Sequence, residues 1–177
     1  MRLFISIEMP DEVKEYLGSI QQNLDFSKDK VKWVSPNQMH LTLKFLGKVQ
    51  ADKVKDVIAA LKEIKVVPFS VNLGSIGVFP NENYIRVVWV GLNPEKGILE
   101  LQKNIDESLK KMFDKEKDFK AHVTLARVKY IENKEEFISK LKHIKIESRN
   151  VNISNFKLMK STLTPKGPVY EEVEIFK

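Results

Sequence analysis

Two pairs of histidine and threonine are the residues of this sequence whose types and spacing could carry out a reaction. His40 and Thr42 form the first pair, in the run HLTL, and His122 and Thr124 form the second, in the run HVTL. Two of the three histidines in the chain therefore have a threonine two positions later. Because random placement rarely gives such a repeat, we interpret the two pairs as parts of one site.

An acid–base reaction on a phosphate is the chemistry that these residue types favour. The unperturbed pKa of histidine, about 6.5, allows one imidazole to accept a proton while another donates one near neutral pH. A threonine hydroxyl can donate a hydrogen bond to a phosphate oxygen. Two histidines on opposite sides of a phosphate could therefore break a P–O bond without a metal ion.

Metal and serine chemistry have less support in the sequence. Cysteine is absent, and neither pair carries a carboxylate at a ligand spacing, so we predict no metal site. The sequence also has no Gly-x-Ser-x-Gly turn and no glycine-rich nucleotide-binding loop. The third histidine, His143, lies among lysines near the end of a predicted helix, so we interpret it as a surface residue.

The elements that must position the two pairs are strands. Side chains alternate between the two faces of a strand, so each histidine shares a face with its threonine, while the aliphatic residues between them face a core. The order strand, helix, histidine strand, helix, strand occurs twice, and the two histidines lie 82 residues apart. We interpret this pattern as an internal duplication that brings the two pairs into one cleft.

The periodicity of apolar residues predicts the remaining elements. The expected strands cover residues 2–9, 31–34, 40–46, 69–78, 84–92, 121–130, 151–163 and 169–176. One expected helix follows Pro10. Three others cover residues 51–65, 95–113 and 135–142, the last with a capping box from Asn133 to Glu136. No flexible linker interrupts this order, so we expect a single two-lobed α+β domain over residues 1–177.

The composition limits the partners and the compartment. The 177 residues include 30 basic and 24 acidic side chains, which give a net charge of +6. Such a surface can accept RNA, although a solvated lysine-rich surface is the simpler explanation. No apolar run approaches the ~20 residues that span a bilayer, and no signal peptide is evident. We expect a cytoplasmic protein without a membrane partner, and a monomer because no large apolar surface stripe is evident.

Longer stretches of the sequence resemble one known family. They keep the family's order and span nearly the whole chain: RLFISIEMP (2–10), WVSPNQMHLTLKFLG (33–47), GVFP (77–80), RVVWVG (86–91), FKAHVTLAR (119–127), and Ser161 with GPVY (167–170). They resemble the two-histidine phosphoesterase superfamily and, within it, the RNA 2′,3′-cyclic phosphodiesterases, also called 2′-5′ RNA ligase-like proteins. Ile85 and Ala121 stand where that family often has proline. Neither difference removes a side-chain group that could take part in the reaction.

The resemblance implies a bilobal fold with a pseudo-two-fold axis, in which antiparallel sheets line a central cleft and helices cover the outer faces. It implies hydrolysis of a 2′,3′-cyclic phosphate at an RNA end, such as that of a tRNA fragment, to a 2′-phosphomonoester, without a cofactor. Some members also join RNA ends reversibly through a 2′-5′ bond. By this resemblance His40 would be the proton donor and His122 the proton acceptor. The phosphate ligands would be Thr42, Thr124 and Arg127.

Strand parity complicates the assignment of Arg127. This residue lies five positions after His122, so strict alternation places it on the opposite face, and only a bulge or a strand end would bring it round. Phe45 has the same relation to His40, and we predict that it packs in the core. We make the same prediction for Trp33, Phe79 and Trp89.

Two other functions fit the same residues. An RNA-end or tRNA-binding module with incidental catalysis would also explain the positive charge. A phosphodiesterase for another small substrate, such as a cyclic phosphate on ADP-ribose or a 2′-5′-linked oligonucleotide, would carry the same motifs. The motifs cannot separate these substrates, because they contact only the phosphate.

Overall fold

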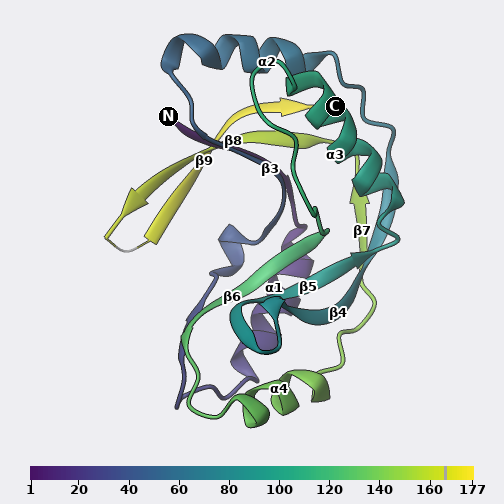
Figure 1. Cartoon of the computed structure of the whole chain (residues 1–177). Coiled ribbons are helices and arrows are strands. Elements are labelled where there is room, and N and C mark those ends of the chain that lie inside the picture. Colours follow the sequence, from purple (N-terminus) through teal and green to yellow (C-terminus); the bar gives the residue numbers. More distant parts are fainter. Residues whose placement is uncertain (166) are drawn as a thin grey trace.

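The strands of the chain form a curled antiparallel sheet that divides into two lobes (Figure 1). The computed structural model describes residues 1–165 and 167–177. The strands follow the order β7-β4-β5-β6-β3-β1-β8-β9, and β2 pairs with β6 outside this path. Their bounds are β1 Arg2–Glu8, β2 Lys30–Trp33, β3 His40–Lys48, β4 Phe69–Asn81, β5 Tyr84–Asn93, β6 His122–Tyr130, β7 Asn150–Ile153, β8 Phe156–Thr164 and β9 Gly167–Phe176.

Helices cover the outer faces of both lobes, which confirms the predicted α+β class (Figure 1). The α-helices are α1 Asp11–Gln22, α2 Val54–Lys62, α3 Lys96–Leu109 and α4 Lys134–His143, and short 3₁₀ helices cover Pro36–Gln38 and Ala51–Lys53. Within the described residues, no helix has the length and apolar character that a membrane crossing requires.

Each lobe takes strands from both halves of the sequence. One lobe contains β3-β1-β8-β9, and the other contains β7-β4-β5-β6 with β2. Strands β3 and β6 meet at one residue pair, Leu41 and Val123, where the lobes join. The duplication in the sequence therefore does not map one half onto one lobe, because β4 pairs with β7 and β8 pairs with β1, each from the other half of the chain.

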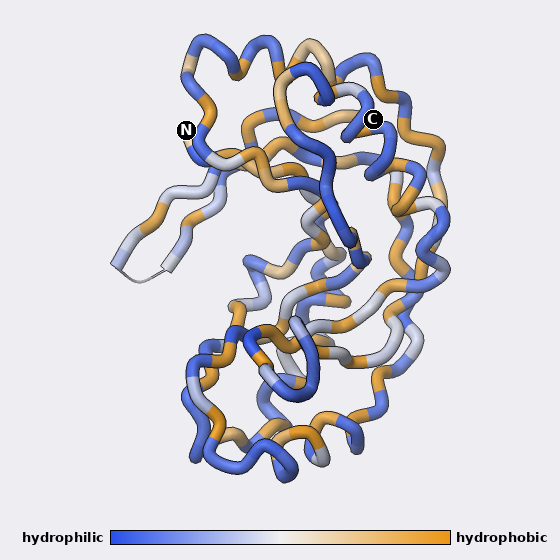
Figure 2. Tube along the Cα trace, viewed as in Figure 1, coloured by the Kyte–Doolittle hydropathy of each residue, from blue (hydrophilic) through white to orange (hydrophobic). Residues whose placement is uncertain are grey.

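Apolar side chains form one large buried cluster and one smaller cluster. The larger cluster includes the buried face of α2, at Val57 and Leu61, and the strand residues beneath it. The smaller cluster lies under α4 in the second lobe, where the rings of Phe26 and Phe137 stack 4.2 Å apart. Figure 2 shows that the segment from α3 to β6 is hydrophilic along most of its length.

A buried ion pair fixes the course of that hydrophilic segment. Lys44 of β3 donates from Nζ to Asp106 Oδ1 of α3 at 2.6 Å and to the backbone oxygen of Asp114 at 2.5 Å. The other carboxylate oxygen of Asp106 accepts from Gln102 Nε2 at 2.8 Å and from the backbone N–H of Glu116 at 3.1 Å. This network joins the first histidine strand to α3 and to the segment that follows α3.

The sequence prediction of a single strand over residues 151–163 is wrong. The chain instead forms β7 in one lobe and β8 in the other, separated by Ser154 and Asn155. Serine and asparagine favour turns because their side chains hydrogen-bond to nearby backbone, and here they let the chain pass between the lobes. The predicted cap at Asn133 is confirmed, since its side chain accepts from the backbone N–H of Glu136 at 3.1 Å.

Candidate active site

Both histidine–threonine pairs flank the residue pair that joins the lobes. Leu41 and Val123 are fully buried at this pair, whereas the histidine and threonine on either side of each are only partly buried. The burial pattern of β3 is the same, residue by residue, as that of β6. The antiparallel register therefore sets His40 near Thr124 and His122 near Thr42 on one face.

Bulges in β3 and β6 reverse the parity of the residues that follow the motifs. In β6, Val88 of β5 pairs with Ala126 and Trp89 pairs with Thr124, so Leu125 is an extra residue. The bulge moves Arg127 to the face of His122. Burial is the largest cause that lowers the pKa of this imidazole, and the positive charge of Arg127 lowers it further. One extra residue in β6 thus changes the face on which Arg127 lies, so strand parity no longer opposes a role for it in the site.

The same shift exposes Phe45, which corrects the prediction that it packs in the core. In β3, Ile5 of β1 pairs with Lys44 and Ser6 pairs with Thr42, so Leu43 is the extra residue. Phe45 is 66% exposed and Lys44 is buried instead. Simple alternation would have placed these two side chains the other way round.

Each histidine is held by a hydrogen bond from its Nδ1 atom. His40 Nδ1 lies 2.7 Å from the backbone oxygen of Gln38, and His122 Nδ1 lies 2.7 Å from the backbone oxygen of Lys120. A carbonyl oxygen only accepts, so Nδ1 carries the proton in both rings. Nε2 is therefore the atom of each neutral imidazole that can accept a proton from a bound molecule.

Aromatic rings pack against both imidazoles. The centroids of Phe4 and Tyr170 lie 5.0 and 5.3 Å from that of His40. Phe79 lies 4.9 Å from His122, nearly perpendicular to it, and Trp89 lies 6.0 Å away. Phe79 and Trp89 are only partly buried, so they line the site rather than a closed core as we predicted.

Sequence reasoning did not single out Phe4 and Tyr170. The signal was available, because both lie inside the stretches 2–10 and 167–170 that resemble the phosphoesterase family. Their contact with His40 depends on pairing between distant strands, since β1 lies between β3 and β8, and β9 follows β8. Periodicity along the chain does not report such contacts.

Gly77 allows Trp89 to lie flat against β4. A β-carbon at position 77 would lie 2.2 Å from the Trp89 ring, far inside contact distance. Gly77 pairs with Trp89 across β4 and β5, so any side chain would push the indole away from its place beside His122.

Burial favours the neutral form of both histidines. It lowers the pKa of His40 to about 4, against a smaller opposing effect of the hydrogen bond to Gln38, and the charge of His122 lowers this pKa further. Burial is also the largest cause that lowers the pKa of His122. Glu8 pairs with His40 across β1 and β3, and its carboxylate acts in the opposite direction on the pKa of His40.

Two lysines keep that carboxylate ionised. Lys14 Nζ and Lys157 Nζ each lie 2.6 Å from an oxygen of Glu8, and these hydrogen bonds lower its pKa to about 2. Glu8 thus stays a fixed negative charge over the range in which His40 titrates.

The pKa of His40 predicts a pH-dependent stability. From pH 6.5 down to about 4, the unfolded state binds a proton that folded His40 excludes. The free energy of unfolding therefore falls as the pH is lowered through this window, by about 3 kcal/mol for the full shift. Urea unfolding of the wild type and of His40→Asn across this range measures the effect. An equal pH dependence in both proteins would contradict it.

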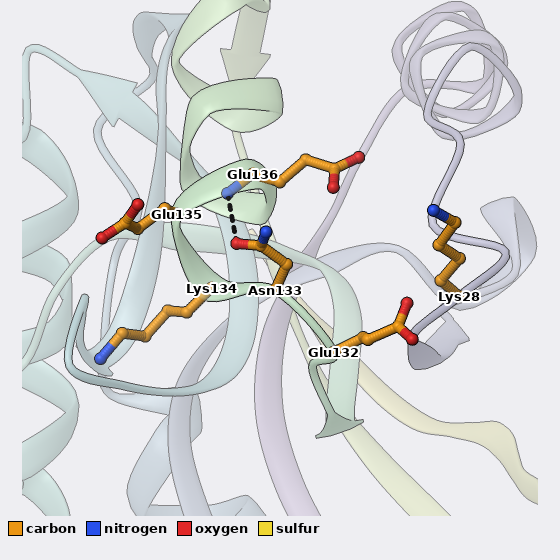
Figure 3. A pocket seen from close by; sticks show the side chains of 6 residues that line it. All are labelled: Lys28, Glu132, Asn133, Lys134, Glu135 and Glu136. Atoms are coloured by element: carbon orange, nitrogen blue, oxygen red, sulfur yellow. Dashed lines mark hydrogen bonds between the residues drawn. The ribbon is translucent and has the colours of Figure 1, made fainter.

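A shallow hollow on the surface is separate from the histidines. It lies at the start of α4 (Figure 3) and is lined by Lys28, Glu132, Asn133, Lys134, Glu135 and Glu136. Five of these six side chains are charged, all six are exposed, and the neutral Asn133 cap lies at the centre of the group. Over residues 1–165 and 167–177, no three His, Cys, Asp or Glu side chains gather as ligands for a metal ion.

Comparison with known proteins agrees with the fold and the two motifs. The family model for LigT-like phosphoesterases matches the chain twice, over residues 7–89 and 90–170. The chain therefore belongs to the LigT-like phosphoesterase family, which confirms the resemblance seen in the sequence. The two matches also divide the chain near its middle, in agreement with an internal duplication.

Relatives of nearly the same length carry the name RNA 2′,3′-cyclic phosphodiesterase. The protein of Methanocaldococcus jannaschii is 37% identical over 176 residues, which cover 98% of this chain and 99% of the relative. The protein of Archaeoglobus fulgidus is 36% identical over 177 residues, which cover 99% of this chain and 99% of the relative. A crystal structure of a Thermus thermophilus protein matches with a TM-score of 0.80 and 29% identity, over 99% of this chain and 97% of that chain.

Proposed function

We propose that the protein hydrolyses the 2′,3′-cyclic phosphate at an RNA end to a 2′-phosphomonoester. The observation that carries this proposal is the placement of two histidines, each with Nε2 as the free ring nitrogen, beside one junction between two strands. Membership of the phosphoesterase family and the names of its relatives support the same reaction.

The reaction needs one proton acceptor and one proton donor. Nε2 of His122 takes a proton from water as the water oxygen attacks phosphorus, opposite the 3′ oxygen. The P–O3′ bond breaks, and Nε2 of protonated His40 gives its proton to the departing oxygen. The product carries a 2′-phosphate and a 3′ hydroxyl. The near symmetry of the site would equally allow His40 to be the proton acceptor and His122 the proton donor. The assignment of the two roles therefore follows the resemblance to the family.

Thr42, Thr124 and Arg127 bind the non-bridging phosphate oxygens. Among the described residues, neither threonine hydroxyl hydrogen-bonds to another protein group, so both can donate to an anion. The bulge in β6 supports the role of Arg127, since it brings a guanidinium to the face of His122. Such donors stabilise the charge that develops as the bond breaks.

A bound phosphate also resolves the low pKa of His40. An acid must be protonated when the substrate is present, yet burial favours the neutral imidazole of His40. A phosphodiester anion between the rings stabilises the imidazolium and raises the pKa of His40. Substrate binding and protonation of the acid are therefore linked, and the rate should follow a bell-shaped pH profile.

The first experiment incubates the purified protein, in EDTA, with a short RNA that ends in a 2′,3′-cyclic phosphate. We expect a 2′-phosphate product, identified by ³¹P NMR, at a rate that EDTA does not reduce. A 3′-phosphate product would contradict the proposed product, because it would show that the P–O2′ bond breaks and the 2′ oxygen is the leaving group. Loss of activity in EDTA that a divalent ion restores would contradict a metal-free reaction.

The same assay separates the alternatives. An RNA-end-binding module would bind the RNA and release no product. A phosphodiesterase for another small substrate would leave RNA intact but cleave a cyclic phosphate on ADP-ribose or a 2′-5′-linked oligonucleotide. Reversible 2′-5′ ligation would appear as joined product when a cyclic-phosphate end and a 5′-hydroxyl end are supplied together.

The remaining proposals concern the state of the protein in the cell. We propose one phosphoesterase domain over residues 1–177, which acts as a monomer in the cytoplasm on RNA ends such as those of tRNA fragments. The residue pair that joins the lobes supports a single domain, because both sides of the site meet there. Light scattering on the purified protein tests the monomer.

A further inference from the structure

Strand β2 places two lysines beside the proposed phosphate site. Lys32 pairs directly with Arg127 of β6, and Lys30 pairs with Tyr130 further along the same two strands. Directly opposite residues of antiparallel strands share a face, so these four side chains lie on one face. The Lys32 amino group also lies 3.6 Å from the position that a β-carbon on Gly167 would take, next to the β8–β9 turn. We call Lys30, Lys32 and Tyr130 the β2–β6 strip.

The charges of this strip are not balanced by carboxylates. Many other lysines of the protein pair with Asp or Glu, as Lys120 does with Glu95 at 3.1 Å. Within the part of the chain that the structure describes, neither lysine of the strip nor Arg127 lies within 4.0 Å of a carboxylate oxygen. All three are exposed, and Tyr130 beside them is 54% exposed.

This arrangement is unfavourable for the folded protein by itself. Like charges directly opposite each other on neighbouring strands repel, and Lys32 faces Arg127 without a carboxylate between them. A local arrangement that opposes stability is typical of a functional surface. An anion that lies over the pair would remove the repulsion.

We propose that the β2–β6 strip binds the RNA chain on the 5′ side of the nucleotide that carries the cyclic phosphate. This inference rests on the proposed function. The cyclic phosphate is the last group of such an RNA, so every other phosphate lies on its 5′ side and must leave the site in that direction. Lys32 and Lys30 contact these backbone phosphates, and Tyr130 stacks on a base. The preferred substrate is therefore an oligonucleotide rather than a cyclic mononucleotide.

A simpler role for the two lysines is protection of an edge. Among the strands that the structure describes, β2 pairs with β6 alone, and lysine on an edge strand discourages pairing with other chains. That role predicts aggregation of a lysine-free variant and no change in RNA binding. It does not account for the repulsion between Lys32 and Arg127 or for the exposed Tyr130.

The test compares Lys30→Gln/Lys32→Gln with the matched pair Lys55→Gln/Lys103→Gln. Lys55 and Lys103 are exposed on α2 and α3, outside the two motifs, and their removal takes away the same charge. Two substrates are used, a cyclic mononucleotide and a short RNA with the same cyclic end. We expect kcat/KM for the RNA to fall about tenfold in the first variant only, with the mononucleotide value unchanged.

Binding of the 2′-phosphate RNA product, followed by fluorescence anisotropy against salt, gives a second readout. Loss of two phosphate contacts should lower the slope of log affinity against log salt by about 1.4. Tyr130→Ala should weaken binding and leave this slope unchanged. An equal loss in the control pair, or equal loss with both substrates, would overturn the proposal. If the wild type cleaves neither substrate, the proposed function fails, while the anisotropy still tests the strip.

Discussion

Substitution of His40 or His122 by alanine is expected to lower kcat for RNA 2′,3′-cyclic phosphate about 10²–10⁴-fold, without loss of the fold. Each ring supplies one of the two proton transfers, and water replaces it poorly. The two histidines act on the same transition state, so the double variant should be only slightly slower than either single variant. Single-turnover kinetics with circular dichroism of each variant measure rate and fold together.

The chain supplies a matched control for these variants. His143 is exposed at the end of α4, and its Nδ1 also contacts a backbone oxygen, that of Ser139 at 2.7 Å. Because it lies outside the cleft, His143→Ala should keep the wild-type rate. Activity that survives in both His40→Ala and His122→Ala would place the reaction elsewhere on the protein.

Substitution of Lys44 by methionine is expected to lower the free energy of unfolding by about 3–5 kcal/mol. The Lys44 side chain is 2% exposed and that of its partner Asp106 is 7% exposed, so the substitution leaves a carboxylate buried without a cation. The second hydrogen bond of Lys44, to the backbone of Asp114, is lost as well. Urea unfolding followed by tryptophan fluorescence measures the change.

Two further variants separate charge from packing. Lys44→Met/Asp106→Leu removes both charges and should recover part of the lost stability. Lys53→Met breaks an exposed pair with Asp56, whose side chains are 60% and 57% exposed, and should cost less than about 1 kcal/mol. Equal effects of Lys44→Met and Lys53→Met would show that burial adds nothing to the ion pair.

Local patterns were sufficient to predict the strands of the site and its four motif residues. Strict alternation holds from His40 to Leu43 and from His122 to Leu125, so the shared face of each pair could be read directly. Beyond those residues the bulges invert the pattern. For this reason Phe45 was assigned wrongly to the core, and parity opposed the position of Arg127.

What the sequence could not supply is contact between distant strands. The rings beside His40 come from β1 and β9, and a bulge depends on the partner strand as much as on the bulged residues. The division of residues 151–163 into two strands has the same origin. The buried positions change from Val151 and Ile153 to Phe156 and Leu158 across Ser154 and Asn155, but only the partners of β7 and β8 show that the two strands lie in different lobes.

The exchange of strands between the two halves has a consequence for synthesis of the protein. Strand β1, made first, pairs on one side with β3 and on the other with β8, where Arg2 lies opposite Ser161. A ribosome-bound chain that already contains both histidines but not yet β8 therefore still has an unpaired edge on β1, the strand next to the first histidine strand. Pairings this remote in sequence form slowly. We expect the reaction centre to become ordered only after the last strands emerge, so a nascent chain would stay inactive until its translation is almost complete.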